Sequence, residues 1–130
     1  MKWLSKDDVI FLHSKLILKT GGEDGIRDDK ILDSSINSPL QTFDKEDLYP
    51  TIFEKITRFS YCLVCNHPFL DGNKRIGALV LCLLFKLNNI NFEINNEDLT
   101  NSILLLASSE LDYERFKIYI FSHINSKEGL

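Results

Sequence analysis

The chain has 130 residues, a net charge of −4 and a sequence pI of about 5.3. Its residues are 44% hydrophobic and 26% charged, a balance typical of a soluble globular protein, and we expect one domain over residues 1–130. The acidic charge argues against broad binding to nucleic acid or to an anionic membrane, because both partners select a basic face. A local anion site stays possible.

No segment of the sequence predicts export or membrane insertion. Asp7, Asp8 and His13 stand where a secretory leader needs an unbroken apolar core. The most hydrophobic run, residues 76–85, is about half as long as the ~20 residues that a membrane-spanning helix needs. The three cysteines are an odd number, which favours a reducing compartment, so we predict a cytoplasmic protein.

Helical signals account for the first part of the chain. Ser5 with Asp8 predicts the N-terminal cap of a first helix, and the glycine pair at 21–22 predicts its end. A short second helix is predicted to open at Asp28 and to end at Pro39.

The middle of the chain predicts two buried helices. Residues 40–47 are polar and predict a loop, after which Asp47 and Pro50 predict a helix start. The apolar positions of this helix repeat as one buried stripe: Ile52, Ile56, Phe59 and Leu63. We expect the polar side chains between them to face outward: Glu54, Lys55, Thr57 and Arg58. Residues 74–87 are apolar on nearly all sides and predict a central helix surrounded by others.

Two more helices are predicted after a short extended piece at 91–95. One covers residues 97–108 with Asn96 as its cap, and the other covers 113–124 with Asp112 as its cap. The sequence therefore predicts an all-α protein.

Residues 66–77, NHPFLDGNKRIG, place polar chemistry between the two buried helices. Residues 71–73, Asp-Gly-Asn, precede the central helix, whose first turn has unpaired N–H groups and a partial positive charge. Lys74 and Arg75 add two cations at that same end, where the helix dipole disfavours them. A bound phosphate chain would offset this cost, so the pattern predicts an anion site.

His67 and Asp71 add groups that transfer to a hydroxyl requires. Neutral imidazole is the usual base for a hydroxyl, and a carboxylate beside phosphates is a natural Mg²⁺ ligand. Asn73 can hold a phosphate oxygen or its own loop, and Phe69 is expected to anchor that loop in the core. The set is typical of phosphoryl or nucleotidyl transfer. Each residue alone also fits a cap, a turn or a solvated surface, so the prediction depends on their combination.

Residues 67–75, HPFLDGNKR, resemble the signature of the Fic/Doc superfamily, HxFx[D/E][G/A]N[G/K]R. Fic enzymes have glycine at the position of Lys74, and the lysine looks like the Doc (death-on-curing) toxin branch. The segments GIRD at 25–28 and LYPT at 48–51, together with residues 39–43, also look like Doc-type chains. The resemblance covers nearly the whole chain and implies a Fic-type helical domain, in which the motif loop leads into a central buried helix.

The resemblance also implies an activity. Doc toxins are expected to transfer the γ-phosphate of ATP to a threonine of elongation factor Tu and so halt translation, whereas most Fic enzymes transfer AMP to a protein hydroxyl. Carried over to this chain, His67 would be the base and Asp71 would hold Mg²⁺. The phosphates of ATP would be bound by the rest of the motif: Gly72, Asn73, Lys74 and Arg75.

Two departures from the Fic pattern bear on the alternatives. Fic enzymes carry a second arginine where this chain has Ala78, which favours phosphate transfer over AMP transfer. The inhibitory motif of self-regulated Fic proteins, [S/T]xxxE[G/N], is absent, because its nearest matches at 42–47 and 124–129 each fail at one end. The resemblance therefore implies a separate Phd-type antitoxin. A non-enzymatic Fic-fold interaction module is the remaining alternative, and the intact motif argues against it.

Other candidate residues have simpler explanations. Cys62 and Cys65 form a CxxC and Cys82 lies on the next helix, but a zinc site would need a fourth ligand and a closed geometry. Cysteines three residues apart share a helix face, so small core residues are the simpler interpretation. We expect two histidines, His13 and His123, to be hydrogen-bonded in or beside the core. Two further side chains, Tyr49 and Arg27, could contact a partner or only pack turns.

Overall fold

The structure is a computed structural model and describes residues 1–126 and Leu130. This part of the chain contains six α-helices, which confirms the predicted all-α class. They are α1 (Lys6–Thr20), α2 (Asp29–Asn37), α3 (Ile52–Asn66), α4 (Asn73–Leu87), α5 (Asn96–Ala107) and α6 (Tyr113–Phe121). The 3-10 helix η1 (Ser38–Leu40) follows α2. Two antiparallel pairs join β1 (Thr42–Phe43) to β2 (Glu46–Asp47) and β3 (Asn91–Phe92) to β4 (Ile124–Asn125).

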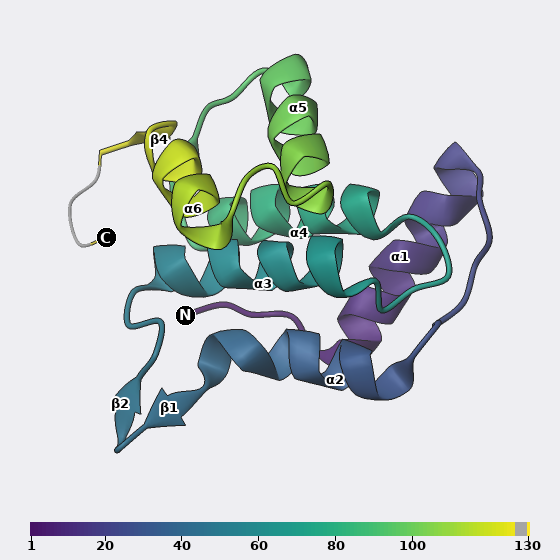
Figure 1. Cartoon of the computed structure of the whole chain (residues 1–130), viewed down its shortest axis with the longest axis horizontal. Helices are drawn as coiled ribbons and strands as arrows, with labels where there is room; N and C mark the ends of the chain where they lie inside the picture. Colours follow the sequence, from purple (N-terminus) through teal and green to yellow (C-terminus); the bar gives the residue numbers. More distant parts are fainter. Residues whose placement is uncertain (127–129) are drawn as a thin grey trace.

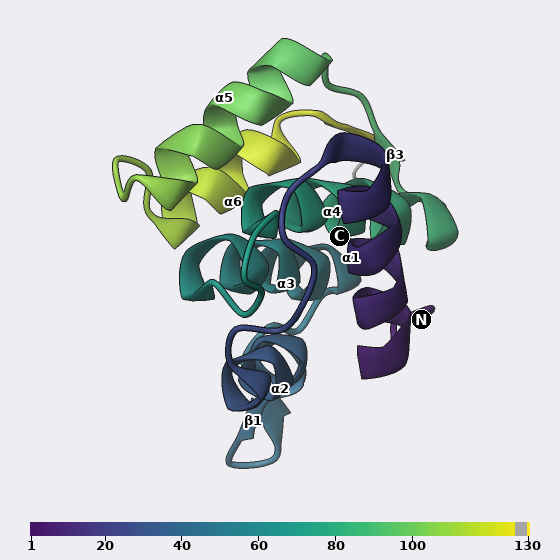
Figure 2. The ribbon, with the colours of Figure 1, turned by 90° about the vertical axis from the view of Figure 1, so that its right-hand side faces the viewer.

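The helices α3 and α4 lie side by side at the centre of the molecule (Figure 1). Figure 2 shows α2 on one side of this pair, α5 and α6 on the opposite side, and α1 along the edge. The central pair supplies many of the fully buried side chains of the core, among them Ile56, Phe59, Leu63, Ile76, Val80, Leu81 and Leu84. The loop that joins α3 to α4 lies at the end of this pair, beside α1 (Figure 1).

Gly77 lets the two central helices approach each other closely. A Cβ atom at Gly77 would lie 2.5 Å from Cγ2 of Val64 and 3.3 Å from the backbone oxygen of Ser60. The buried hydroxyl of Ser60 donates a hydrogen bond to the carbonyl of Gly77 at 2.8 Å, which satisfies both groups. This contact sets the separation of the helices that flank the polar loop.

Most predicted helix starts are confirmed, but the start of α3 is wrong. Three caps accept the N–H group of the third helical residue as predicted: Ser5, Asp28 and Asp112. The cap of α3 is Thr51, whose hydroxyl accepts from the N–H group of Glu54, rather than Asp47 or Pro50. Asp47 instead pairs with Lys55, with 3.1 Å between Oδ2 and Nζ. Farther along, α5 is capped by Asn95, one residue before the predicted Asn96.

Three other expectations are wrong. Lys55 and Thr57 are buried rather than facing outward, because the ammonium of Lys55 reaches Asp47 and the hydroxyl of Thr57 donates to the carbonyl of Phe53. Residues 40–47 include the β1–β2 hairpin rather than only a loop. The last predicted helix ends at Phe121, and the residues after it pair as β4 with β3.

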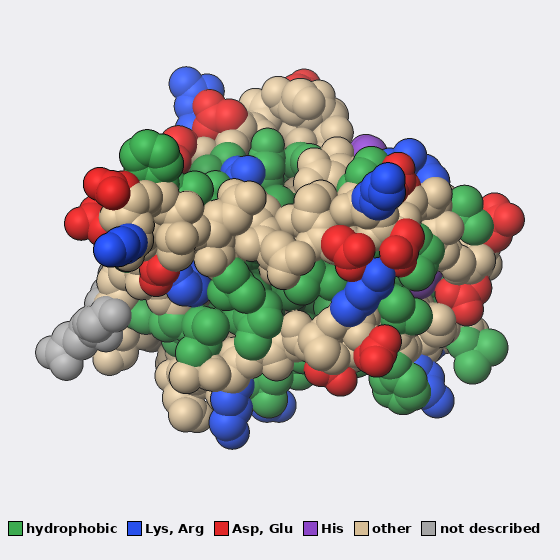
Figure 3. Space-filling view, turned by 90° about the horizontal axis from the view of Figure 1, so that it is seen from below, with side chains coloured by type: hydrophobic (Ala, Val, Ile, Leu, Met, Phe, Trp, Pro, Cys, Tyr) green, Lys and Arg blue, Asp and Glu red, His purple; other side chains and the backbone are tan. Residues whose placement is uncertain are grey.

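The surface fits the charge argument. Figure 3 shows acidic and basic side chains intermingled over one face, so that face is not a basic surface for nucleic acid. Within residues 1–126 and 130, no helix has the length and apolar character needed to cross a bilayer.

Candidate active site

Loop 67–72 joins α3 to α4 and carries the first half of the predicted site. His67 ends α3 in the left-handed conformation, with φ of 51° and ψ of 57°, and is exposed. Phe69 is 1% exposed and packs in the hydrophobic core. The loop thus exposes the imidazole of His67 and buries the ring of Phe69.

Asn73 holds the backbone of this loop. Its Oδ1 atom accepts a hydrogen bond from the N–H group of Phe69, and its Nδ2 atom donates to the carbonyl of the same residue, both at 3.0 Å. The two bonds use the donor and the acceptor of a carboxamide, which an aspartate could not supply. Of the two roles expected for Asn73, the structure contains the loop-holding one.

Residues 23–28 form a second support for the loop. Ile26 and Phe69 pair in an isolated antiparallel β-bridge. Backbone hydrogen bonds on either side of it run from the N–H of Arg27 to the oxygen of Pro68 (2.8 Å) and from the N–H of Leu70 to the oxygen of Gly25 (3.0 Å). Two segments that are distant in the sequence therefore share a backbone network.

The side chain of Arg27 binds the end of α3. Its Nη2 atom donates to the oxygen of Asn66 at 3.0 Å and its Nε atom donates to the oxygen of His67 at 2.5 Å. A cation that meets the last carbonyls of a helix is favourable, because these groups carry the negative end of the helix dipole. The sequence alone allows either contact with a partner or packing of a turn for Arg27, because no local pattern links positions 40 residues apart.

The helix α4 begins without a side-chain cap. The other five α-helices in the described chain each have a Ser, Thr, Asp or Asn cap that accepts a backbone N–H group. The residue at this position of α4 is Gly72, with φ of 77°, and it makes no such bond. The N–H groups of the first turn of α4 are therefore free of a side-chain acceptor and suited to an anion.

The carboxylate of Asp71 stands just before this turn. It accepts hydrogen bonds from the N–H groups of Gly72 at 2.8 Å and Glu23 at 3.3 Å. These two bonds, aided by the guanidinium of Arg75, lower the pKa of Asp71 below its ordinary value. Its side chain is 48% exposed. Asp71 is thus an ionised, accessible carboxylate at neutral pH, the kind of ligand that a hard cation prefers.

The two cations of the motif have different surroundings. Lys74 is exposed and pairs with no carboxylate in the described part of the chain. Arg75 donates to the carbonyl of Gly21 at 2.7 Å and to the hydroxyl of Thr20, and its Nη2 atom lies 3.4 Å from Asp71 Oδ1. Arg75 therefore holds the end of α1, whereas the ammonium of Lys74 is available.

The cysteines form no metal site in the structure as described. Residues 1–126 and 130 contain no group of three or more His, Cys, Asp or Glu side chains that could hold a metal ion. Burial raises the pKa of all three thiols, that of Cys65 to about 11, so they are protonated and poor ligands at neutral pH. The thiol of Cys65 points to the carbonyl of Leu106 at 3.7 Å.

The remaining predicted positions contact other elements. His123 is hydrogen-bonded to the carbonyl of Tyr119 at 3.0 Å through Nδ1, and the ring of Tyr49 lies under the guanidinium of Arg58. Of the two near matches to the inhibitory motif, residues 42–47 form the β1–β2 hairpin. The other, at 124–129, lies partly outside the described residues.

Comparison with known proteins identifies the family of this chain. The model of the Fic/DOC family matches residues 3–85, a range that includes α1, loop 67–72 and the start of α4. This chain belongs to the Fic/DOC family. It is also 29% identical over 107 residues to the Toxin Doc of Mycolicibacterium smegmatis, an alignment that covers 78% of this chain and 80% of that protein. The resemblance to the Fic/Doc superfamily is thereby confirmed.

Proposed function

We propose that this Fic/DOC protein is a toxin that transfers the γ-phosphate of ATP to a hydroxyl of a target protein. The start of α4 carries the proposal, because this uncapped helix end stands between the ionised carboxylate of Asp71 and the ammonium of Lys74, which pairs with no carboxylate among the described residues. Such a set offers donors to phosphate oxygens, a ligand to a hard cation and a positive charge. The relative named Toxin Doc supports the toxin part of this proposal.

In this proposal His67 is the general base. Its imidazole is exposed at the end of α3. Arg27 holds the backbone of His67, so the ring projects from a fixed position in the loop that leads to the anion site. His67 takes the proton of the target hydroxyl as that oxygen attacks the γ-phosphorus, and the bond from phosphorus to the β–γ bridging oxygen breaks, releasing ADP. The amide groups after Gly72 and the ammonium of Lys74 face the charge on the phosphates.

The residues fit a Mg²⁺ ion that arrives with ATP. This ion keeps several waters and is commonly bound by one or two carboxylates together with substrate phosphates. Asp71 is such a carboxylate, half exposed and next to the proposed phosphate site. The ion would neutralise charge on the phosphate oxygens, and Asp71 would hold it.

Transfer of phosphate rather than AMP is proposed from two positions. Lys74 and Ala78 stand where AMP-transferring Fic enzymes have glycine and a second arginine. The proposed target is a threonine of elongation factor Tu in the cytoplasm. The proposed regulator is a separate Phd-type antitoxin, since the chain lacks the complete inhibitory motif.

A labelling experiment tests the reaction. The protein is incubated with Mg²⁺, purified elongation factor Tu and ATP labelled at either the α- or the γ-phosphate. Label from the γ-phosphate alone is expected. Label from the α-phosphate would contradict phosphate transfer and indicate AMP transfer. Label that appears in proteins of a cell lysate but not in the purified factor would show that the target is a different protein.

The His67→Ala variant tests whether the protein is an enzyme at all. Loss of a general base lowers a rate by about 10²–10⁴-fold, so growth inhibition in cells should disappear. Growth inhibition at the wild-type level would instead mean that the protein acts by binding alone.

A further inference from the structure

We propose that His13 on α1 is a positioning residue for this anion site. In this proposal His13 fixes the carbonyl of Asp71. That carbonyl precedes the first turn of α4, so its position sets the direction in which the amide groups of this turn face the phosphates. The inference rests on the proposed function, and it adds a residue from outside the motif to the machinery that binds the nucleotide.

The first observation is a buried hydrogen bond between α1 and the loop. His13 is 1% exposed, and its Nε2 atom lies 2.7 Å from the backbone oxygen of Asp71, 58 residues away in the sequence. A carbonyl oxygen only accepts hydrogen bonds, so Nε2 carries the hydrogen. The ring thereby ties α1 to the residue that precedes the uncapped turn.

The second observation is contact with the rest of the loop. The ring of His13 stacks on that of Phe69 with 3.7 Å between centroids and 6° between planes. A Cβ atom at Gly72 would lie 3.5 Å from His13 Nε2 and 2.9 Å from Cδ1 of Ile17, the next turn of α1. The same face of α1 therefore contacts the loop before and after Asp71.

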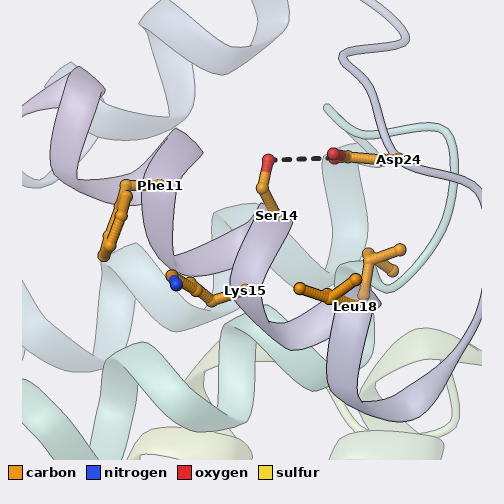
Figure 4. Close-up of a pocket in the computed structure, with 6 residues that line it drawn as sticks. Phe11, Ser14, Lys15, Leu18 and Asp24 are labelled. Carbon is orange, nitrogen blue, oxygen red and sulfur yellow. Dashed lines mark hydrogen bonds between the residues drawn. The ribbon is translucent and has the colours of Figure 1, made fainter.

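The third observation concerns the other nitrogen of the ring. Its Nδ1 atom lies 3.5 Å from Oδ1 of Asp24. That carboxylate accepts a hydrogen bond from the hydroxyl of Ser14 at 3.0 Å, and Figure 4 shows this bond linking α1 to the segment that follows it. The imidazole thus stands between the carboxylate of Asp24 and the carbonyl of Asp71, and its Nε2 atom makes the hydrogen bond to that carbonyl.

A purely structural histidine would satisfy a core carbonyl and affect stability alone. The acceptor here is instead the carbonyl one residue before Gly72, where the helix lacks a cap. Without the His13 bond, the side chains of Asn73 and Asp71 still hold parts of the loop, but among the described residues no other side chain of α1 donates a hydrogen bond to the carbonyl of Asp71. Loss of His13 should therefore weaken nucleotide binding by more than the loss of stability explains.

Three variants separate positioning from stability. His13→Gln keeps an N–H donor of similar reach, and His13→Leu keeps volume but removes the donor. Val9→Ala is the matched control, because Val9 lies one turn earlier on α1 and is fully buried. Calorimetry measures binding of MgATP, chemical denaturation measures the free energy of unfolding, and hydrogen exchange measures protection of the Phe69 amide in the free protein.

His13→Leu is expected to weaken MgATP binding about tenfold or more, the loss of one well-placed hydrogen bond, and His13→Gln to recover most of it. Val9→Ala should lower stability yet leave the affinity unchanged. Equal affinities in His13→Leu and the wild type would overturn the inference, as would equal losses in His13→Leu and Val9→Ala.

The exchange measurement separates failure of this inference from failure of the proposed function. Should the wild-type protein neither bind nor use MgATP, the proposed function falls, and exchange of the Phe69 amide still tests positioning. Faster exchange in His13→Leu than in Val9→Ala supports the role of His13, and equal rates refute it.

Discussion

The guanidinium of Arg27 donates hydrogen bonds to the backbone oxygens of both Asn66 and His67, so one cation closes the end of α3 where the proposed base stands. His67 adopts the left-handed conformation there, which non-glycine residues adopt rarely. These two bonds and the pairing of residues 26 and 69 act together with the side chain of Asn73 to keep the backbone of the loop in place.

Replacing Arg27 should therefore affect catalysis more than stability. Arg27→Ala is expected to lower the rate of transfer about tenfold or more, with a loss of unfolding free energy of about 1 kcal/mol, because the arginine is exposed. Arg27→Lys keeps the charge but not the fork that reaches two carbonyls, so an intermediate rate is expected. Single-turnover rates and urea denaturation measure the two effects. A transfer rate that follows stability alone in both variants would contradict a role in orienting His67.

Lys74→Ala should separate nucleotide binding from folding. Its ammonium is exposed and unpaired in the described chain, so its removal should change the unfolding free energy by less than about 0.5 kcal/mol. Binding of MgATP should weaken clearly, since a cation at the phosphate site is lost. Lys86→Ala, an exposed lysine in the last turn of the same helix, is the matched control. Equal affinities of the two variants, measured by calorimetry, would exclude Lys74 from the phosphate site.

Asp71→Asn should change the acid dependence of stability. The folded pKa of Asp71 lies below its ordinary value of 3.8, so the folded protein binds fewer protons there than the unfolded chain. Its stabilising effect is fully present above pH 3.8 and is lost as the pH falls through the folded pKa. The difference in unfolding free energy between wild type and variant should thus shrink below about pH 4. A difference that is constant from pH 6 to the lowest accessible pH would show that the carboxylate is not held as described.

Gly77→Ala should destabilise the fold itself. The added methyl group would lie within 2.5 Å of Val64, and the helices cannot separate without disturbing the core between them. A loss of about 1–3 kcal/mol in unfolding free energy is expected, as for other overpacked cores. Gly21→Ala is a useful contrast, because open space surrounds that position although its φ of 87° is strained. Equal melting temperatures of Gly77→Ala and the wild type would refute the close contact.

The sequence predicts the helices better than it predicts the supports of the site. Amphipathic spacing and caps such as Ser5 and Asp112 are local signals, and they place five of the six starts to within a residue or two. The predicted start of α3 is wrong because Asp47, a residue type that often caps helices, instead pairs with the buried Lys55. A charge pair between a hairpin and a helix has no periodic signature.

The same limit applies to the site. Residues 67–75 are contiguous, so their residue types and order are visible in the sequence, and they form the loop 67–72 between α3 and α4 and the first turn of α4. Arg27 and His13 reach this loop from 40 and 58 residues away, and each bonds to backbone oxygens that every residue has. Nothing in the types of their partners marks them, so only the folded chain reveals these two contacts.

Arg75 binds the last turn of α1, through Gly21 and Thr20, and is also expected to bind phosphate. The bonds to α1 both come from Nη1 of Arg75, so a phosphate that took these donors would release the end of α1, whereas Nε and the second hydrogen of Nη2 could bind without that loss. A nucleotide that took the Nη1 donors and a molecule that bound the glycine turn at 21–22 would then change each other's affinity by the same factor. The end of the first helix would in that case be a control point for the proposed reaction that lies outside the proposed site.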